Sequence, residues 1–304
     1  MIPKEYEKNE KTVTVSVVNF NPVWGDKAAN LQKIKTMVIS ASQGGSNIIA
    51  FPELALSGYE CGDEARRDHK PCSMHEEAAE TIPGSSTAEL AKLTKELGIY
   101  VLLGMPERDE KDPSVRYISV AVIGPEGILG RYRKIHLAPL PTFTEQVCFK
   151  TGNELPVFET KYGRIGVQIC ADFWVYPELS RILCLKGAIL IINCAACPVG
   201  PIGPEFIAQI TGSRGIENFI YAASASLAGK ERTVSYYGRS TIAGRAFPSF
   251  RQIFAQGEDR EEIVSATLIF EKAQPPFDHL SLEKERIRSL QLCANELKKL
   301  AKSR

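Results

Sequence analysis

Short apolar segments rich in β-branched residues recur along the chain, and they constrain its fold more than any other feature. Eight such segments occur: TVTVSVVNF (12–20), NIIAF (47–51), IYVLLGM (99–105), YISVAVIG (117–124), RIGVQIC (164–170), AILIIN (188–193), NFIYAASAS (218–226) and EIVSATLIF (262–270). Short continuous apolar runs of this kind are typical of strands that are buried on both faces. The sequence therefore predicts a largely buried sheet.

Helical patterns separate several of these predicted strands. Residues 26–42 carry apolar side chains at the spacing of one helical face. Further helices are predicted over 85–97, 177–186, 203–218 and 282–303. Strands that alternate with helices favour an α/β layered fold. Segments 99–105 and 117–124 follow each other directly, so we expect antiparallel pairs to be mixed in.

Length and composition favour one ordinary globular domain. The chain has 304 residues, of which 44% are hydrophobic and 24% charged, and its net charge is +1. Because no internal repeat or low-complexity linker divides it, we predict a single domain over 1–304. Its core is expected at about 13–270 and a C-terminal helical extension at about 281–303. The near-neutral charge argues against a nucleic-acid partner.

The expected compartment follows from the absence of targeting and spanning signals. The N-terminal MIPKEYEKNEKTV has no apolar h-region, and the longest apolar run, 188–196, is too short to cross a bilayer. We therefore expect a cytoplasmic protein with no membrane partner. The eight cysteines are expected as reduced thiols rather than as a disulfide framework.

Three reactive side chains stand at or near the ends of predicted strands, and each allows two interpretations. Glu53 follows a strand among apolar neighbours, where burial would raise its pKa and suit a general base, although surface or capping glutamates are common. Lys134 is expected on a short strand, where alternation puts it on one face with Tyr132 and His136. It could stabilise an oxyanion or simply be solvated. Cys170 ends a strand and is either a nucleophile or a buried core thiol.

Two groups of cysteines and histidines suggest metal or redox chemistry. Cys61, His69, Cys72 and His75 have the residue types of a zinc site, but their C-x7-H-x2-C-x2-H spacing is not that of a standard finger. Cys194 and Cys197 form a CxxC, but the prolines and glycines that follow predict a loop, whereas redox pairs open a helix. We therefore expect no metal site and treat a zinc- or thiol-based regulatory protein as an alternative.

The order of the three reactive residues identifies a family. Glu53 in FPELALSGY, Lys134 in RKIHL and Cys170 in GVQICAD resemble the Glu-Lys-Cys triad of the nitrilase superfamily, the carbon–nitrogen hydrolases. Supporting blocks in the same order are PELSRILCLKGAILIIN (177–193), RGIENFIYAASASLAG (214–229) and YGRSTIAG (237–244). The resemblance covers nearly the whole chain, from about Val13 to Phe270.

This resemblance implies a fold and a mechanism. The fold would be a four-layer α-β-β-α sandwich, paired through a two-fold interface into a homodimer or larger homo-oligomer. Cys170 would attack the substrate carbon and form a thioester, with Glu53 as the base. Lys134 and the backbone N–H of Ala171 would stabilise the oxyanion. Glu145, in TEQVCFKTG, would position the substrate and the lysine. No cofactor is implied.

The expected reaction is hydrolysis of a small-molecule amide to a carboxylate and ammonia. The resemblance implies an amide rather than a nitrile, because amidase-type members commonly have an aspartate where this chain has Asp172. Asp172 itself is expected to cap or orient the turn. The loop 59–83 would rim the pocket, and the substrate-binding residues would be Tyr59, Trp174, Cys194 and Ala195. The alternatives are a nitrilase, an N-carbamoyl-amide hydrolase and a non-catalytic binding protein that keeps the fold.

Overall fold

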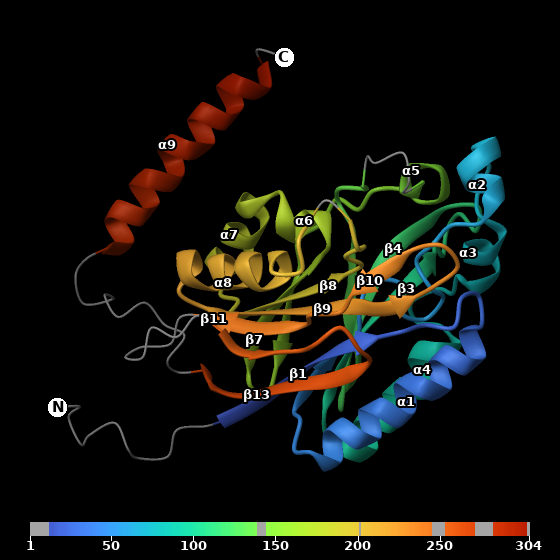
Figure 1. Ribbon diagram of the computed structural model, residues 1–304. Coiled ribbons are helices and arrows are strands. Elements are labelled where there is room, and N and C mark those ends of the chain that lie inside the picture. The colour runs from blue at the N-terminus through green and yellow to red at the C-terminus, as the bar shows by residue number, and fades with distance from the viewer. Residues whose placement is uncertain (1–11, 139–143, 201, 245–252, 271–281, 303–304) are drawn as a thin grey trace. The chain divides into compact units, whose positions relative to one another are not determined.

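The computed structural model describes residues 12–138, 144–200, 202–244, 253–270 and 282–302 (Figure 1). The chain divides into two compact units, Met1–Ala273 and Gln274–Arg304. The second unit contains the helix α9 (Leu282–Lys302), where the sequence predicts a C-terminal helix. All other helices and strands that the structure describes belong to the first unit.

All eight strands predicted from apolar runs are present, and the structure adds four short ones. The predicted strands are β1 (Thr12–Phe20), β2 (Ile48–Ala50), β3 (Tyr100–Arg108), β4 (Arg116–Gly124), β7 (Gly163–Ile169), β8 (Leu190–Ala195), β9 (Tyr221–Lys230) and β13 (Glu262–Ile269). The strand β5 (Gly127–Arg133) overlaps the short strand expected around Lys134. The added strands are β6 (Val157–Thr160), β10 (Ser235–Tyr237), β11 (Thr241–Gly244) and β12 (Ile253–Gln256). The added strands are short or less apolar, which explains why apolar runs alone do not reveal them.

The strands pair in the order β5-β4-β3-β2-β1-β9-β8-β7-β6, with β10 to β13 paired alongside. Parallel pairs run through the centre from β3 to β7, and antiparallel pairs stand at both ends. The junction between β1 and β9 consists of two residue pairs, Asn19–Ser226 and Phe20–Leu227. So short a junction divides the strands into two halves, β5 to β1 and β9 to β6.

The helices of the first unit lie between these strands in the chain. They are α1 (Lys27–Gln43), α2 (Asp63–Asp68), α3 (Ser73–Ala78), α4 (Ser85–Leu97), α5 (Glu145–Cys148), α6 (Ala171–Trp174), α7 (Pro177–Leu185) and α8 (Phe206–Asn218). The Asp26 side chain caps α1 by accepting the N–H of Ala29, and α7 begins with Pro177, a residue suited to the first helical turn. The structure starts α8 at Phe206, three residues later than predicted, because a turn occupies 203–205.

Three apolar layers show how the halves and the helices stack. The largest lies between the two halves and joins side chains such as Val15 and Leu102 of one half to Val167 and Ile192 of the other. A second layer packs α1 and α4 against the first half, and a third packs α7 and α8 against the second half (Figure 1). The fold is therefore the expected four-layer α-β-β-α sandwich.

The segment around Lys134 corrects one local prediction. The strand β5 ends at Arg133, so Lys134 and His136 lie beyond it rather than on it. The Lys134 N–H still donates to the Ile118 carbonyl, and Tyr132 and Lys134 are both buried. The ladder therefore stops one residue before the lysine, and the structure excludes the solvated lysine that the sequence left open.

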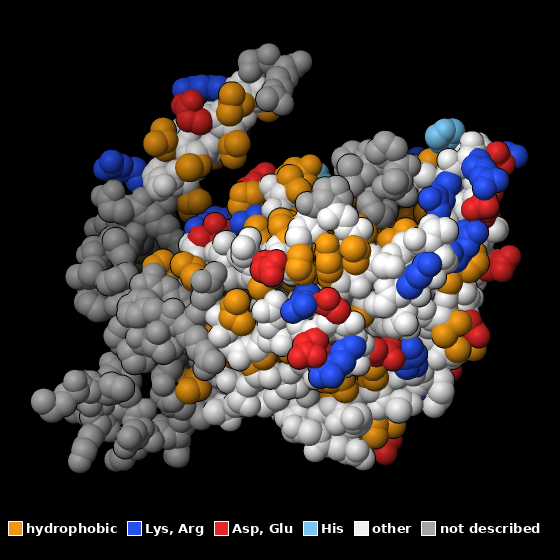
Figure 2. Space-filling view, viewed as in Figure 1, with side chains coloured by type: hydrophobic (Ala, Val, Ile, Leu, Met, Phe, Trp, Pro, Cys, Tyr) orange, Lys and Arg blue, Asp and Glu red, His pale blue; other side chains and the backbone are white. Residues whose placement is uncertain are grey.

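The surface carries mixed charges. Figure 2 shows lysine, arginine, aspartate and glutamate side chains interspersed over this face, with no broad patch of one sign among its described residues. Within the described ranges, no helix has both the length and the apolar character needed to span a membrane.

The layered packing predicts which side-chain truncations lower the free energy of unfolding most. Ile192→Ala removes a fully buried side chain from the layer between the halves, so we expect the free energy of unfolding to fall by about 2–5 kcal/mol. The matched change Ile182→Ala on α7 removes a side chain that is 39% exposed, and we expect an effect within about 0.5 kcal/mol. Urea unfolding measures both; equal losses would contradict the assigned layers.

Candidate active site

The ends of three strands bring the predicted triad together. Glu53 lies three residues beyond β2, Lys134 directly follows β5, and Cys170 directly follows β7. All three side chains are at most 4% exposed. Lys134 Nζ donates to Glu53 Oε1 over 2.7 Å. The structure therefore places the glutamate and the lysine in direct contact, within the electrostatic reach of the cysteine.

Two glycines allow the backbone to approach this cluster. A side chain at Gly104 would collide with the carbonyl of Pro52, the residue before Glu53. A side chain at Gly152 would collide with the carbonyl of Arg133, the residue before Lys134. The Gly152 N–H also donates to the Lys134 carbonyl over 2.7 Å. Both glycines are therefore required by close packing against the segments that carry Glu53 and Lys134.

Glu145 is a second carboxylate on Lys134. It begins the short helix α5, and its Oε1 accepts from Lys134 Nζ over 2.8 Å and from the Tyr59 hydroxyl. Its Oε2 accepts the N–H of Ala138 over 2.8 Å. Because an ammonium has three N–H donors and the two glutamates take two, one remains for another acceptor.

The cluster controls the protonation of Glu53. Burial, opposed by the Lys134 charge and assisted by that of Glu145, raises the pKa of Glu53 to about 7. The lysine keeps its proton: burial alone would lower the pKa of Lys134, but Glu145 and Glu53 hold it well above its usual range. Glu53 Oε2 is buried and has no hydrogen-bond partner among the described residues. This oxygen is therefore available to accept a proton near neutral pH.

Cys170 stands at a strained turn between β7 and α6. Its φ of 50° and ψ of −108° lie in a region that L-residues rarely adopt, at a cost on the order of 1–3 kcal/mol. The turn is held because the Cys170 N–H donates to the Asn193 side chain over 2.9 Å and to the Cys194 carbonyl over 3.1 Å. Burial and the Glu53 charge raise the pKa of the thiol well above its usual range, against the opposing charge of Lys134. The thiol therefore needs a base to ionise.

Asp172 connects the nucleophile turn to the lysine segment. Its buried carboxylate accepts the Tyr132 hydroxyl over 2.7 Å and the N–H groups of Ile135 and His136 over 3.0 and 2.8 Å. It also pairs with His136 Nδ1 over 2.8 Å. Asp172, expected to cap or orient its turn, makes four side-chain contacts on both sides of Lys134.

Two further residues that the sequence did not single out hold the site. The Arg214 guanidinium donates to the carbonyls of Phe173 and Trp174 and so fixes the end of α6. Glu231 accepts the backbone N–H groups of Tyr59 and Glu60. In the sequence, the one sign of a role for Arg214 is its position at the start of the block RGIENF.

A pocket opens beside Glu145. Its empty volume is about 310 Å³, part of it open to solvent, and its lining is Leu54, Tyr59, Glu60, Cys61, Thr144, Glu145, Phe149 and Val234. Tyr59 and Glu145 therefore both face a cavity. The other proposed substrate residues lie beside the nucleophile. Trp174 is on α6 with a buried Nε1 that lacks a partner among the described residues, and Cys194 and Ala195 end β8, fully buried.

The two cysteine and histidine groups separate in space. Cys61, which lines the pocket, converges with Cys72 and His75, whereas His69 is exposed at the end of α2. Cys194 and Cys197 are buried free thiols, and the described residues that follow Cys197 form no helix before α8, as predicted.

Comparison with known proteins agrees with this geometry. The family profile described as carbon–nitrogen hydrolase matches residues 14–275. A probable nitrilase of Schizosaccharomyces pombe is 34% identical over 264 residues, which are 86% of this chain and 90% of that protein. An omega-amidase of Xenopus tropicalis is 31% identical over 282 residues, 90% of this chain and 94% of that protein.

A solved structure extends the match to three dimensions. The crystal structure of Saccharomyces cerevisiae Nit3, described as a member of the nitrilase superfamily, superposes with a TM-score of 0.75 at 26% identity and covers 91% of this chain and 97% of its own. The sandwich fold, the family profile and the relatives agree. This chain belongs to the carbon–nitrogen hydrolase family of the nitrilase superfamily.

Proposed function

We propose that this enzyme hydrolyses a small-molecule amide to a carboxylate and ammonia through a thioester on Cys170. The observation that carries the proposal is the buried cluster in which Lys134 contacts Glu53 and Glu145 while Glu53 Oε2 stays unpaired. A thiol that ionises reluctantly, a base with a pKa of about 7 and a fixed ammonium form a complete set for acyl transfer.

In the acylation step, Cys170 Sγ attacks the amide carbonyl carbon while its proton passes to Glu53. The carbonyl π electrons move to oxygen, and this oxyanion accepts hydrogen bonds from Lys134 and from the Ala171 N–H. Ala171 is the first residue of α6, so its N–H has no acceptor within the helix. The C–N bond then breaks, Glu53 gives the proton to nitrogen, and ammonia leaves a thioester on the cysteine.

In the deacylation step, a water molecule gives a proton to Glu53 and attacks the thioester carbonyl carbon. The second tetrahedral intermediate uses the same two oxyanion donors. When the C–S bond breaks, the carboxylic acid leaves and the thiolate recovers the proton from Glu53. Glu53 therefore acts twice as a base and twice as an acid, which suits a pKa near neutrality.

A nitrilase and an N-carbamoyl-amide hydrolase remain the alternatives on the same residues. The relatives include a probable nitrilase as well as omega-amidases, so similar chains are described both as nitrile-hydrolysing and as amide-hydrolysing enzymes. An ammonia-release screen over aliphatic, aromatic, ω-amido and carbamoyl compounds and nitriles distinguishes them. Turnover of nitriles alone would reject the amide proposal, and a folded protein inactive on every class would favour a non-catalytic binding protein.

We also propose that the active form is a homodimer or larger homo-oligomer in the cytoplasm. The support is the resemblance to the nitrilase superfamily, whose sandwiches pair through a two-fold interface. Sedimentation velocity tests the assembly, and a monomer at the concentration of the assay would reject it.

Cys170→Ala removes the nucleophile, so we expect ammonia release to fall on the order of 10⁴-fold or more. The control Cys184→Ala removes a half-buried thiol from α7, outside the site, and should leave turnover unchanged. Mass spectrometry of the intact wild-type protein during turnover should show an acyl adduct that Cys170→Ala lacks. Wild-type rates in Cys170→Ala would reject the mechanism.

The pH dependence of kcat/KM reports the protonation state of Glu53. Only the ionised carboxylate accepts the thiol proton, so we expect kcat/KM to rise with pH up to about 7 and then level. The Glu145 charge raises the pKa of Glu53. Glu145→Gln should therefore shift the rising limb of the kcat/KM profile to lower pH, whatever its effect on the maximum rate. A wild-type limb near the ordinary value of 4.5 would contradict the assignment.

Asp172→Asn tests the connection between the nucleophile turn and the lysine segment. An amide cannot accept hydrogen bonds at its nitrogen, so at least one of the four contacts is lost and Lys134 shifts. We expect kcat to fall on the order of 10²-fold in a protein that remains folded. His136→Ala, which removes only the half-exposed side-chain contact, should cost less; the opposite ranking in steady-state kinetics would refute this role.

A further inference from the structure

A second cluster of reactive side chains lies beside the active site and takes no part in the proposed chemistry. Its members Cys61, Cys72, His75 and Cys148 are 8%, 0%, 0% and 6% exposed. All three cysteines are free thiols. Three thiols and an imidazole gathered in a buried position are the residue types of a soft-metal site, and apolar side chains would fill the same space without polar atoms.

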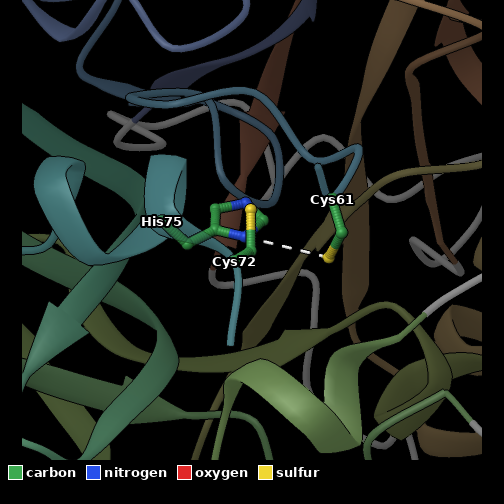
Figure 3. Close-up of side chains that lie close together, drawn as sticks. All are labelled: Cys61, Cys72 and His75. Atoms are coloured by element: carbon green, nitrogen blue, oxygen red, sulfur yellow. Dashed lines mark hydrogen bonds between the residues drawn. The ribbon is translucent and has the colours of Figure 1, made fainter. Parts of the chain in front are cut away.

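Three of the four ligand atoms already converge. The side-chain ligand atoms of Cys61, Cys72 and His75 all lie within 4.8 Å of one another. Figure 3 shows these side chains pointing toward one another from two separate segments, with Cys61 Sγ at 3.9 Å from His75 Nδ1. Cys72 and His75 are three residues apart at the start of α3, which brings them to the same side of that turn.

Cys148 supplies the fourth position. Its Sγ lies 3.7 Å from Cys61 Sγ, far beyond the length of a disulfide, which is about 2.05 Å. Two thiolates that bind one zinc at about 2.3 Å in a tetrahedron stand about 3.8 Å apart, which matches the observed separation. The group whose ligand atoms all lie within 4.8 Å of one another comprises Cys61, Cys72 and His75, so a four-ligand site requires the Cys148 side chain to move closer to Cys72 and His75.

The surroundings of the cluster fix its ligands. His75 Nε2 faces the Gly58 carbonyl at 3.2 Å, so a proton there leaves Nδ1 free to bind a metal. The Gly62 N–H donates to Cys72 Sγ over 3.2 Å. Outer hydrogen bonds of these two kinds orient the imidazole and stabilise a thiolate.

We propose that Cys61, Cys72, His75 and Cys148 bind one zinc ion in a closed tetrahedral site. Binding releases the three thiol protons to solvent and leaves the imidazole neutral. Because four protein ligands fill the coordination sphere, the zinc has no open position and is structural rather than catalytic. His69, exposed at the end of α2, is not a ligand.

The position of the site indicates which segments the zinc would connect. Cys61 lines the pocket next to Tyr59 and Glu60, and Cys148 ends the helix α5 that Glu145 begins. A zinc ion bound by both would connect the pocket rim and α3 to α5. The ion therefore fixes the segment that presents Glu145 to Lys134 without touching the substrate.

Metal analysis of the folded, full-length protein tests the site. We expect about one zinc per chain after purification without added metal or chelating resin. Cys72→Ser and Cys148→Ser should lose most of it, whereas two controls should keep it: Cys197→Ser, a buried thiol outside the cluster, and His69→Ala. Cys170→Ala should also keep its zinc, so this result is independent of the proposed reaction.

If the variants fail to fold, experiments on the wild-type protein alone still test the proposal. A mercurial reagent titrated into it should release zinc in step with thiol modification, and cobalt exchanged for zinc should give thiolate-to-cobalt charge-transfer absorption. A strong chelator should lower the thermal midpoint of the wild type and of Cys197→Ser. Folded wild-type protein without zinc that takes up neither zinc nor cobalt, or that carries a disulfide among the three cysteines, would overturn the proposal.

Discussion

The Lys134 ammonium, buried between two carboxylates, is the interaction on which the rest of the site depends. An isolated ion in this position would cost several kcal/mol, so the lysine stays charged only because Glu53 and Glu145 both contact it. Two glutamates and one lysine leave an excess negative charge, and burial makes that excess unfavourable. The pKa of Glu53 rises to about 7 for this reason. The arrangement that stabilises the lysine is thus the one that prepares the base.

Buried hydrogen bonds connect the segments around this ion cluster. Asp172 accepts four hydrogen bonds from the strand end and the segment that carry Lys134, and its own turn carries Cys170. One buried carboxylate therefore connects Cys170, the proposed nucleophile, to the segment of Lys134, the proposed oxyanion donor. The strain at Cys170 is tolerated because Asn193 and Cys194 hold its N–H from the neighbouring strand.

Much of the fold could be predicted from the sequence because the physics involved is local. Uniform apolar runs predict the long strands, and caps and periodicity predict α1, α4 and α7. The triad follows from the resemblance of three motifs. Contacts between distant residues were not accessible. Asp172 meets Tyr132 across 40 residues and Cys61 meets Cys148 across 87. Sheet pairing decides these meetings, so the sequence grouped Cys61, Cys72 and His75 with His69, gave no signal for Cys148 and predicted no metal site.

The helix α5 connects the two buried clusters. Four residues are too few to form a stable helix alone, so its place depends on what its side chains hold. Glu145 at one end binds Lys134 and Tyr59, and Cys148 at the other end meets Cys61. Without an ion, Cys148 contributes only weak thiol contacts, and the carboxylate must order the helix by itself. With zinc bound, the helix is ordered in advance, so Glu145 meets the lysine at little cost in entropy. A structural metal outside the catalytic chemistry would in this way support catalysis through the position of one carboxylate.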